Sequence, residues 1–131
     1  MNDQLTGAED QLVEALATAP VGSRRNGAYA LWLFVRTCST LLPPDRLSER
    51  HQSHRLDGLQ RRLRRLPLPS PLRRALAGGL RGLADSSPRA AAVALQQLVA
   101  PARETVGQEA GDAVALAARR ARDAIREART A

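Results

Sequence analysis

Apolar residues along the chain recur at intervals of three and four positions, and proline or glycine separates the segments in which they do so. In the segment 70–83, for example, Leu72, Leu76, Leu80 and Leu83 fall on one face of a helix. No stretch alternates apolar and polar residues with the period of two that a half-buried strand requires. The pattern therefore predicts an all-α fold, a helical bundle of five or six helices.

The most apolar segment spans residues 28–42 and contains all three aromatic residues and the only cysteine. On a helical wheel, Phe34 and Cys38 lie on one broad apolar face. The other side carries a candidate interface of four residues: Tyr29, Trp32, Leu33 and Arg36. A helix that is apolar nearly all round is normally buried, centrally in a bundle or against another subunit. We therefore expect the other helices to pack around this one, with its second face forming either core or interface.

Three other segments are each predicted to form one helix: 6–19, 45–66 and 70–83. The stretch 21–27 is rich in Gly, Ser and Asn, which favours a connector. From 88 to 129 the apolar stripe continues in phase, so this segment is either one helix kinked at Pro101 or two helices. We favour two, because Thr105 and Gln108 fit a capping box that would begin a sixth helix.

The length of 131 residues suits one domain. We expect a single domain over 1–131, with frayed termini at 1–5 and 130–131. A single cysteine cannot form an internal disulfide. The first ten residues lack the basic patch and apolar run of a signal peptide. No apolar run reaches the roughly 20 residues of a membrane span. These features favour a cytoplasmic protein that is not inserted in a membrane.

Positive charge is concentrated in the middle of the chain. The formal net charge is +7, and all twenty basic residues are arginines. Between residues 50 and 81 nine arginines accompany one acid, Asp57, whereas the remainder is nearly neutral. The nine form a candidate basic binding surface: Arg50, Arg55, Arg61, Arg62, Arg64, Arg65, Arg73, Arg74 and Arg81.

Such a surface attracts nucleic-acid phosphates through counterion release, and arginine also pairs well with acidic protein surfaces. No aromatic residue stands among these arginines in the sequence to stack bases. No helix-turn-helix with a plausible recognition helix is evident either. A solvated face without a specific partner is the third interpretation of this surface.

Few residue combinations suggest catalysis or a cofactor. His51, His54 and Asp57 share a metal-ligand spacing, but neighbouring arginines oppose cation binding. Cys38 lies on the most apolar face of its helix, where a thiol is inert. The pair Gly78–Gly79 lies inside a helical pattern and follows no strand, so a helix end or a tight packing contact explains it better than a phosphate loop. We therefore expect no enzyme activity, no metal and no cofactor.

Two functions remain. The first is a non-enzymatic assembly or adaptor module that self-associates or docks on a larger protein, since Trp, Tyr and Arg are enriched in interface hot spots. The second is a small basic subunit that binds the RNA or DNA backbone through the basic surface, within a larger nucleoprotein complex. We expect a protein partner or a homo-oligomer in the first case and a nucleic acid in the second.

Overall fold

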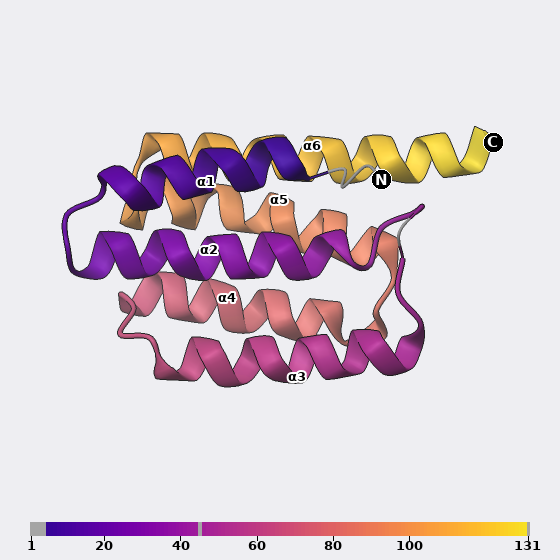
Figure 1. Cartoon of the computed structure of the whole chain (residues 1–131), viewed down its shortest axis with the longest axis horizontal. Coiled ribbons are helices and arrows are strands. Elements are labelled where there is room, and N and C mark those ends of the chain that lie inside the picture. The colour runs from indigo at the N-terminus through magenta and orange to yellow at the C-terminus, as the bar shows by residue number, and fades with distance from the viewer. Residues whose placement is uncertain (1–4, 45, 131) are drawn as a thin grey trace.

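The computed structural model describes residues 5–44 and 46–130, which form an all-helical bundle (Figure 1). The all-α prediction is confirmed. Six α-helices are present in these residues: α1 (Thr6–Thr18), α2 (Ser23–Ser39), α3 (Glu49–Arg65), α4 (Ser70–Gly82), α5 (Pro88–Thr105) and α6 (Gln108–Thr130). A single 3-10 turn, Leu83–Asp85, follows α4. Consecutive helices run antiparallel along one common axis (Figure 1).

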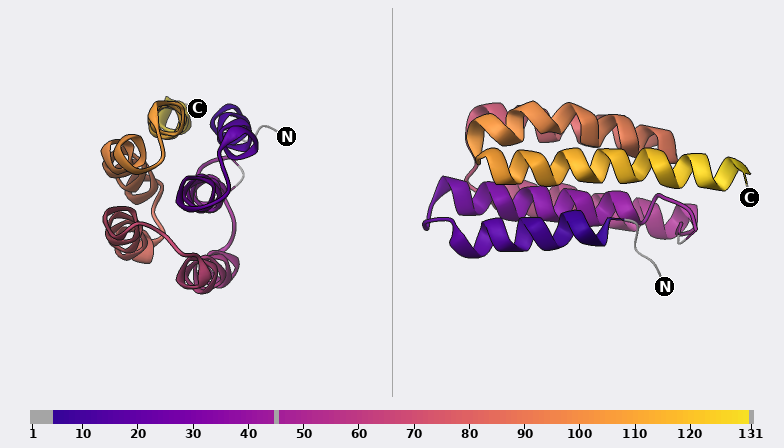
Figure 2. Two further views of the ribbon diagram at one scale, coloured as in Figure 1. Left: turned by 90° about the vertical axis from the view of Figure 1, so that its left-hand side faces the viewer. Right: turned by 90° about the horizontal axis from the view of Figure 1, so that it is seen from above.

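Helix α2 is the central element of the bundle. It contacts α1, α3, α5 and α6, and in the end-on view the other helices curve around it, with no helix of the described residues on the side between α1 and α3 (Figure 2). Its apolar face is inaccessible to solvent, with Leu31, Phe34 and Cys38 each 0% exposed. Burial of aromatic and aliphatic side chains is the main stabilising contribution to a domain of this size. The prediction of a central apolar helix therefore agrees with the structure.

A close helix contact explains the glycine pair of α4. A Cβ atom placed on Gly79 would lie 2.7 Å from Cζ of Phe34, well inside van der Waals contact. The missing side chain lets α4 approach the ring of the central helix. Gly78 points elsewhere, since a Cβ there would meet only Nη2 of Arg81, at 3.7 Å. A tight packing contact, one of the two structural explanations considered above, accounts for Gly79.

The start of α2 differs from the sequence prediction. The helix begins at Ser23, so most of the stretch 21–27 that we expected to be a connector is helical. The break lies at Gly22, whose φ of 132° suits glycine. Gly27 is a packing position rather than a turn, because a Cβ there would lie 2.7 Å from Cγ2 of Val106.

The division between α5 and α6 is confirmed, but its position and its start residue differ from the prediction. Pro101 lies inside α5, which continues to Thr105. The chain turns at Gly107, with φ 145°, where glycine tolerates the left-handed backbone. Thr105 does not cap α6, because its hydroxyl donates to the carbonyl of Pro101 within α5, at 2.7 Å.

Helix α3 is shorter than expected. Ser48 caps it by accepting a hydrogen bond from the backbone N–H of His51, so the helix begins at Glu49 and not near residue 45. Leu47 precedes the helix, and its N–H donates to the carbonyl of Thr40. Residue 45 lies outside the described residues. So do 1–4 and 131 of the expected frayed ends, whereas Leu5 is fully buried.

The buried thiol of Cys38 predicts a pH dependence of stability. Burial raises the pKa of the Cys38 thiol far above its ordinary value, so the folded state keeps a proton that the unfolded chain releases above about pH 8.5. The unfolded state then binds fewer protons, and the free energy of unfolding falls as pH rises above that value, by at most about 1.4 kcal/mol per pH unit. Urea unfolding from pH 7 to 10 should show this slope in the wild type.

The matched control is Cys38→Ala, which retains every other titrating group. Its unfolding free energy should be lower overall, because a fully buried side chain is truncated, but it should lack the alkaline component. Equal alkaline slopes in the two proteins would contradict burial of the thiol.

Candidate functional site: a basic groove between α2 and α3

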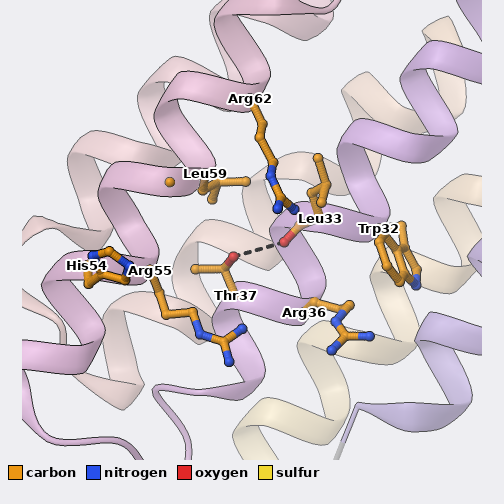
Figure 3. A pocket seen from close by; sticks show the side chains of 9 residues that line it. Trp32, Leu33, Arg36, Thr37, His54, Arg55, Leu59 and Arg62 are labelled. Carbon is orange, nitrogen blue, oxygen red and sulfur yellow. Dashed lines mark hydrogen bonds between the residues drawn. The ribbon is translucent and has the colours of Figure 1, made fainter.

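A groove of about 460 Å³ lies between α2 and α3 (Figure 3). Four residues of α2 and five of α3 line it: Trp32, Leu33, Arg36, Thr37, His54, Arg55, Gly58, Leu59 and Arg62. Arg55 and Arg62 extend from α3 toward α2, with Leu33 and Thr37 between them (Figure 3). We call this feature the α2/α3 groove.

The narrow apolar seam of α3 accounts for the groove. Only Gln52, Leu59 and Leu63 of this helix are buried, so α3 touches α2 along a thin strip. At 100° per residue, Arg55 and Arg62 fall just beside that strip on one flank. A helix with a wider apolar face would bury this flank, whereas here two guanidinium groups border an open space. The bottom of the groove is apolar because Leu33 and Leu59 meet there, 5% and 4% exposed.

Trp32 forms one side of the groove and is held by residues of its own helix. The ring of Tyr29 stacks on it with centroids 5.9 Å apart, and the guanidinium carbon of Arg36 lies over it at 5.0 Å from the ring centre. Arg36 also faces α1, where its Nε lies 3.8 Å from Oε1 of the largely buried Glu9. These contacts fix the indole and link it to α1.

The positive charge of the groove comes mainly from α3. Arg36 is partly neutralised by Glu9, but among the described residues no carboxylate pairs with Arg55 or Arg62. Thr37 is internally satisfied, because its hydroxyl donates to the carbonyl of Leu33 at 3.0 Å (Figure 3). The groove therefore combines an apolar bottom, an aromatic side and two cations that form no ion pair with a carboxylate of residues 5–44 or 46–130.

Gly58 gives the groove its open side. Glycine inside a helix costs about 0.5–1 kcal/mol relative to alanine, and here no internal contact requires it, since a Cβ would meet nothing within 4 Å. This distinguishes Gly58 from Gly27 and Gly79, which are both forced by close packing. A glycine that lines an open groove permits close approach of something outside the described chain.

The groove unites parts of the two candidate surfaces. Trp32, Leu33 and Arg36 come from the candidate interface, with Tyr29 against the indole. Leu33 is buried at the bottom and offers little surface. Two of the nine arginines, Arg55 and Arg62, complete the lining. The other seven are exposed on α3 and α4 outside the groove: Arg50, Arg61, Arg64, Arg65, Arg73, Arg74 and Arg81.

One sequence inference needs correction at this site. We noted no aromatic residue among the nine arginines, but Trp32 of α2 lies in the same groove as Arg55 and Arg62 of α3. The groove brings together residues of two successive helices, with Trp32 more than 20 positions from either arginine, so no local pattern shows it. Gly58 was not among the predicted site residues, because an isolated glycine inside a helical pattern is tolerated and carries no specific signal of function.

Two further features bear on function, clusters of metal ligands and membrane-spanning helices. Among the described residues there is no cluster of three His, Cys, Asp or Glu side chains placed to hold a metal, and His51 contacts Ser48 Oγ through Nδ1, at 2.9 Å. No helix in the described part of the chain is long and apolar enough to cross a membrane. Comparison with protein-family models, with curated proteins and with solved structures found no match.

Proposed function

We propose that this chain is a non-enzymatic helical docking module that binds an acidic helical segment of a protein partner in the α2/α3 groove. The observation that carries the proposal is the combination, in one groove, of the indole of Trp32 and two arginines that pair with no carboxylate among the described residues, above a bottom that includes the largely buried Leu33 and Leu59. An amphipathic helix supplies the matching features, with apolar anchors on one face and carboxylates beside them.

The aromatic contacts favour a protein segment over a nucleic acid in this groove. Sequence-tolerant binding of single strands requires an open aromatic face on which bases stack. Tyr29 already stacks on the indole of Trp32, and the guanidinium of Arg36 lies over the same ring. Less of the ring is therefore available to a base, whereas Trp beside Arg is a frequent hot-spot combination in protein interfaces.

Binding of a nucleic-acid backbone is the second candidate function. The observation in its favour is that all nine arginines are exposed on α3 and α4, which lie side by side in both views (Figures 1 and 2). This function predicts that Arg61→Glu with Arg65→Glu abolishes oligonucleotide binding and leaves the fold intact. It also predicts a steep loss of affinity as salt rises. If the protein binds neither single- nor double-stranded oligonucleotides at moderate salt, this function is excluded.

Gly58 provides a test of the docking function. Gly58→Ala should raise the free energy of unfolding by about 0.5–1 kcal/mol, because alanine is the better helix former and its Cβ meets nothing. Gly58→Gln should also fold at least as stably as the wild type, but its side chain would enter the groove and weaken peptide binding about tenfold. The measurements are urea unfolding and a titration with an acidic amphipathic helical peptide.

The control is Gly82→Gln, a glycine at the end of α4 whose Cβ would also meet nothing within 4 Å and which lies outside the groove. It should leave peptide binding unchanged. If Gly58→Gln binds the peptide as tightly as the wild type does, the groove is not the docking site.

A further inference from the structure

A second basic groove lies between α5 and α6, on a part of the bundle that the proposed function does not use. It has a volume of about 500 Å³. Four arginines surround two aliphatic side chains in it: Arg89, Arg122, Arg126 and Arg129 around Val93 and Ile125. Val93 is 49% exposed and lines the groove together with the partly buried Ile125. We call this feature the α5/α6 groove.

The charge of the α5/α6 groove is only weakly compensated within the chain. Arg122 donates to the neutral amide oxygen of Gln96, at 3.0 Å. Arg126 lies 3.9 Å from Asp123 one turn away on α6, and such an exposed pair contributes little. Among the described residues no carboxylate pairs with Arg89 or Arg129.

Helix α6 leaves this groove open at its C-terminal end. The last turns of α6 project beyond the start of α1, as both the front view and the view from above show (Figures 1 and 2). No residue of α6 after Ala124 is buried. The last residues of α6, from Arg126 to Thr130, are exposed and gain little from packing within the chain, so a docked surface would stabilise this end of the helix.

A complementary surface exists on α1 of the same chain. Of the six described helices α1 alone has a net negative charge, with three acids and no arginine. Glu9 is turned inward to Arg36, whereas Asp10 and Glu14 are exposed on the outer side with Val13, which is 46% exposed. Positions 10, 13, 14 and 17 follow the spacing of one helix face. The acidic face of α1 therefore has an exposed valine, Val13, beside its carboxylates, and the basic groove likewise has an exposed valine, Val93, among its arginines.

We propose that a second copy of this chain docks the outer face of its α1 into the α5/α6 groove. Val13 of one copy packs beside Val93 of the other, and Asp10 and Glu14 lie among the arginines of the groove. Charge complementarity carries the assignment, because opposite signs surround an exposed aliphatic residue on each surface. The contact cannot form within one chain, because α1 is held in place by its inner face, which packs on α2 and α6.

Charge exchange between two variants tests the proposal. Sedimentation of the full chain should show concentration-dependent association that weakens with salt. Arg89→Glu with Arg122→Glu leaves two arginines and two glutamates in the groove and so removes its net positive charge. Asp10→Arg with Glu14→Arg reverses the charge on the outer face of α1. Each double variant alone should associate at least tenfold more weakly than the wild type. A mixture of the two should associate again, because the unchanged acidic face of α1 in the groove variant then meets the unchanged basic groove of the α1 variant.

Arg119→Glu with Arg120→Glu is the control, because these exposed arginines of α6 lie outside the groove and produce the same change in net charge. This variant should associate as the wild type does. A wild type that stays monomeric at every concentration, or a mixture that does not associate, would overturn the proposal. None of these variants changes a residue that lines the α2/α3 groove. A failure of self-association would therefore not affect the peptide-binding test of the proposed docking function.

Discussion

Phe34→Ala should lower the free energy of unfolding by about 3–5 kcal/mol, the usual cost of truncating a fully buried phenylalanine. Phe34 is 0% exposed on the central helix, and its ring lies against Gly79 of α4. Since whole domains are stable by only about 5–15 kcal/mol, the variant should unfold at a much lower urea concentration. Urea unfolding followed by far-ultraviolet circular dichroism measures the change.

Two adjacent glycines provide a control for this contact. Gly79→Ala should destabilise the protein by about 1–3 kcal/mol, because its Cβ would overlap the ring of Phe34. Gly78→Ala should instead stabilise it by about 0.5–1 kcal/mol, because its Cβ has room and alanine favours a helix. If both variants shift stability in the same direction, the packing of α4 against α2 described above is wrong.

Reversing the two α3 arginines that line the α2/α3 groove, Arg55→Glu with Arg62→Glu, should weaken binding of an acidic helical peptide at least a hundredfold. Each hydrogen bond to a charged group contributes about 1.5–3 kcal/mol, and the new carboxylates repel the ligand. Both arginines are exposed, so the fold should be retained. Calorimetric titration of the wild type and of the variant measures the difference.

Arg61→Glu with Arg65→Glu is the matched control, because these arginines lie on the same helix, are exposed and do not line the groove. The two double variants change the net charge of the protein by the same amount, so a general electrostatic effect would weaken peptide binding equally in both. It should bind the peptide within about threefold of the wild type. Equal losses in the two variants would mean that overall charge, and not the groove, attracts the peptide.

The sequence predicted the helices because each one has to bury an apolar stripe. The central place of residues 28–42 followed from a segment that is apolar on nearly every side, which only a helix with neighbours all round can satisfy. The errors lie where a glycine or a proline has a tertiary role. Gly27 is helical because Val106 packs close to it, and Pro101 is accommodated inside α5. The local sequence shows neither the packing of Val106 against Gly27 nor the continuation of α5 through Pro101.

The grooves were less predictable than the helices. Trp32 and Arg62 belong to different helices, and a wheel drawn for one helix does not show how two helices meet. The α5/α6 groove was missed for a similar reason. Its arginines are divided between α5 and α6, and acids on another side of α6, such as Asp123 and Glu127, make the local net charge nearly neutral. The net charge of a sequence segment therefore does not show this basic surface, which becomes evident only when the residues are placed in three dimensions.

The most direct test of the docking function uses the fluorescence of Trp32, the only tryptophan of the chain, which lines the α2/α3 groove. An acidic amphipathic helical peptide should change its emission saturably in the wild type, and a peptide with every Glu replaced by Gln should not. A DNA duplex should bind without changing the emission or should not bind at all. Emission that stays constant with the acidic peptide, or that changes only with the duplex, would contradict an acidic helical partner in this groove.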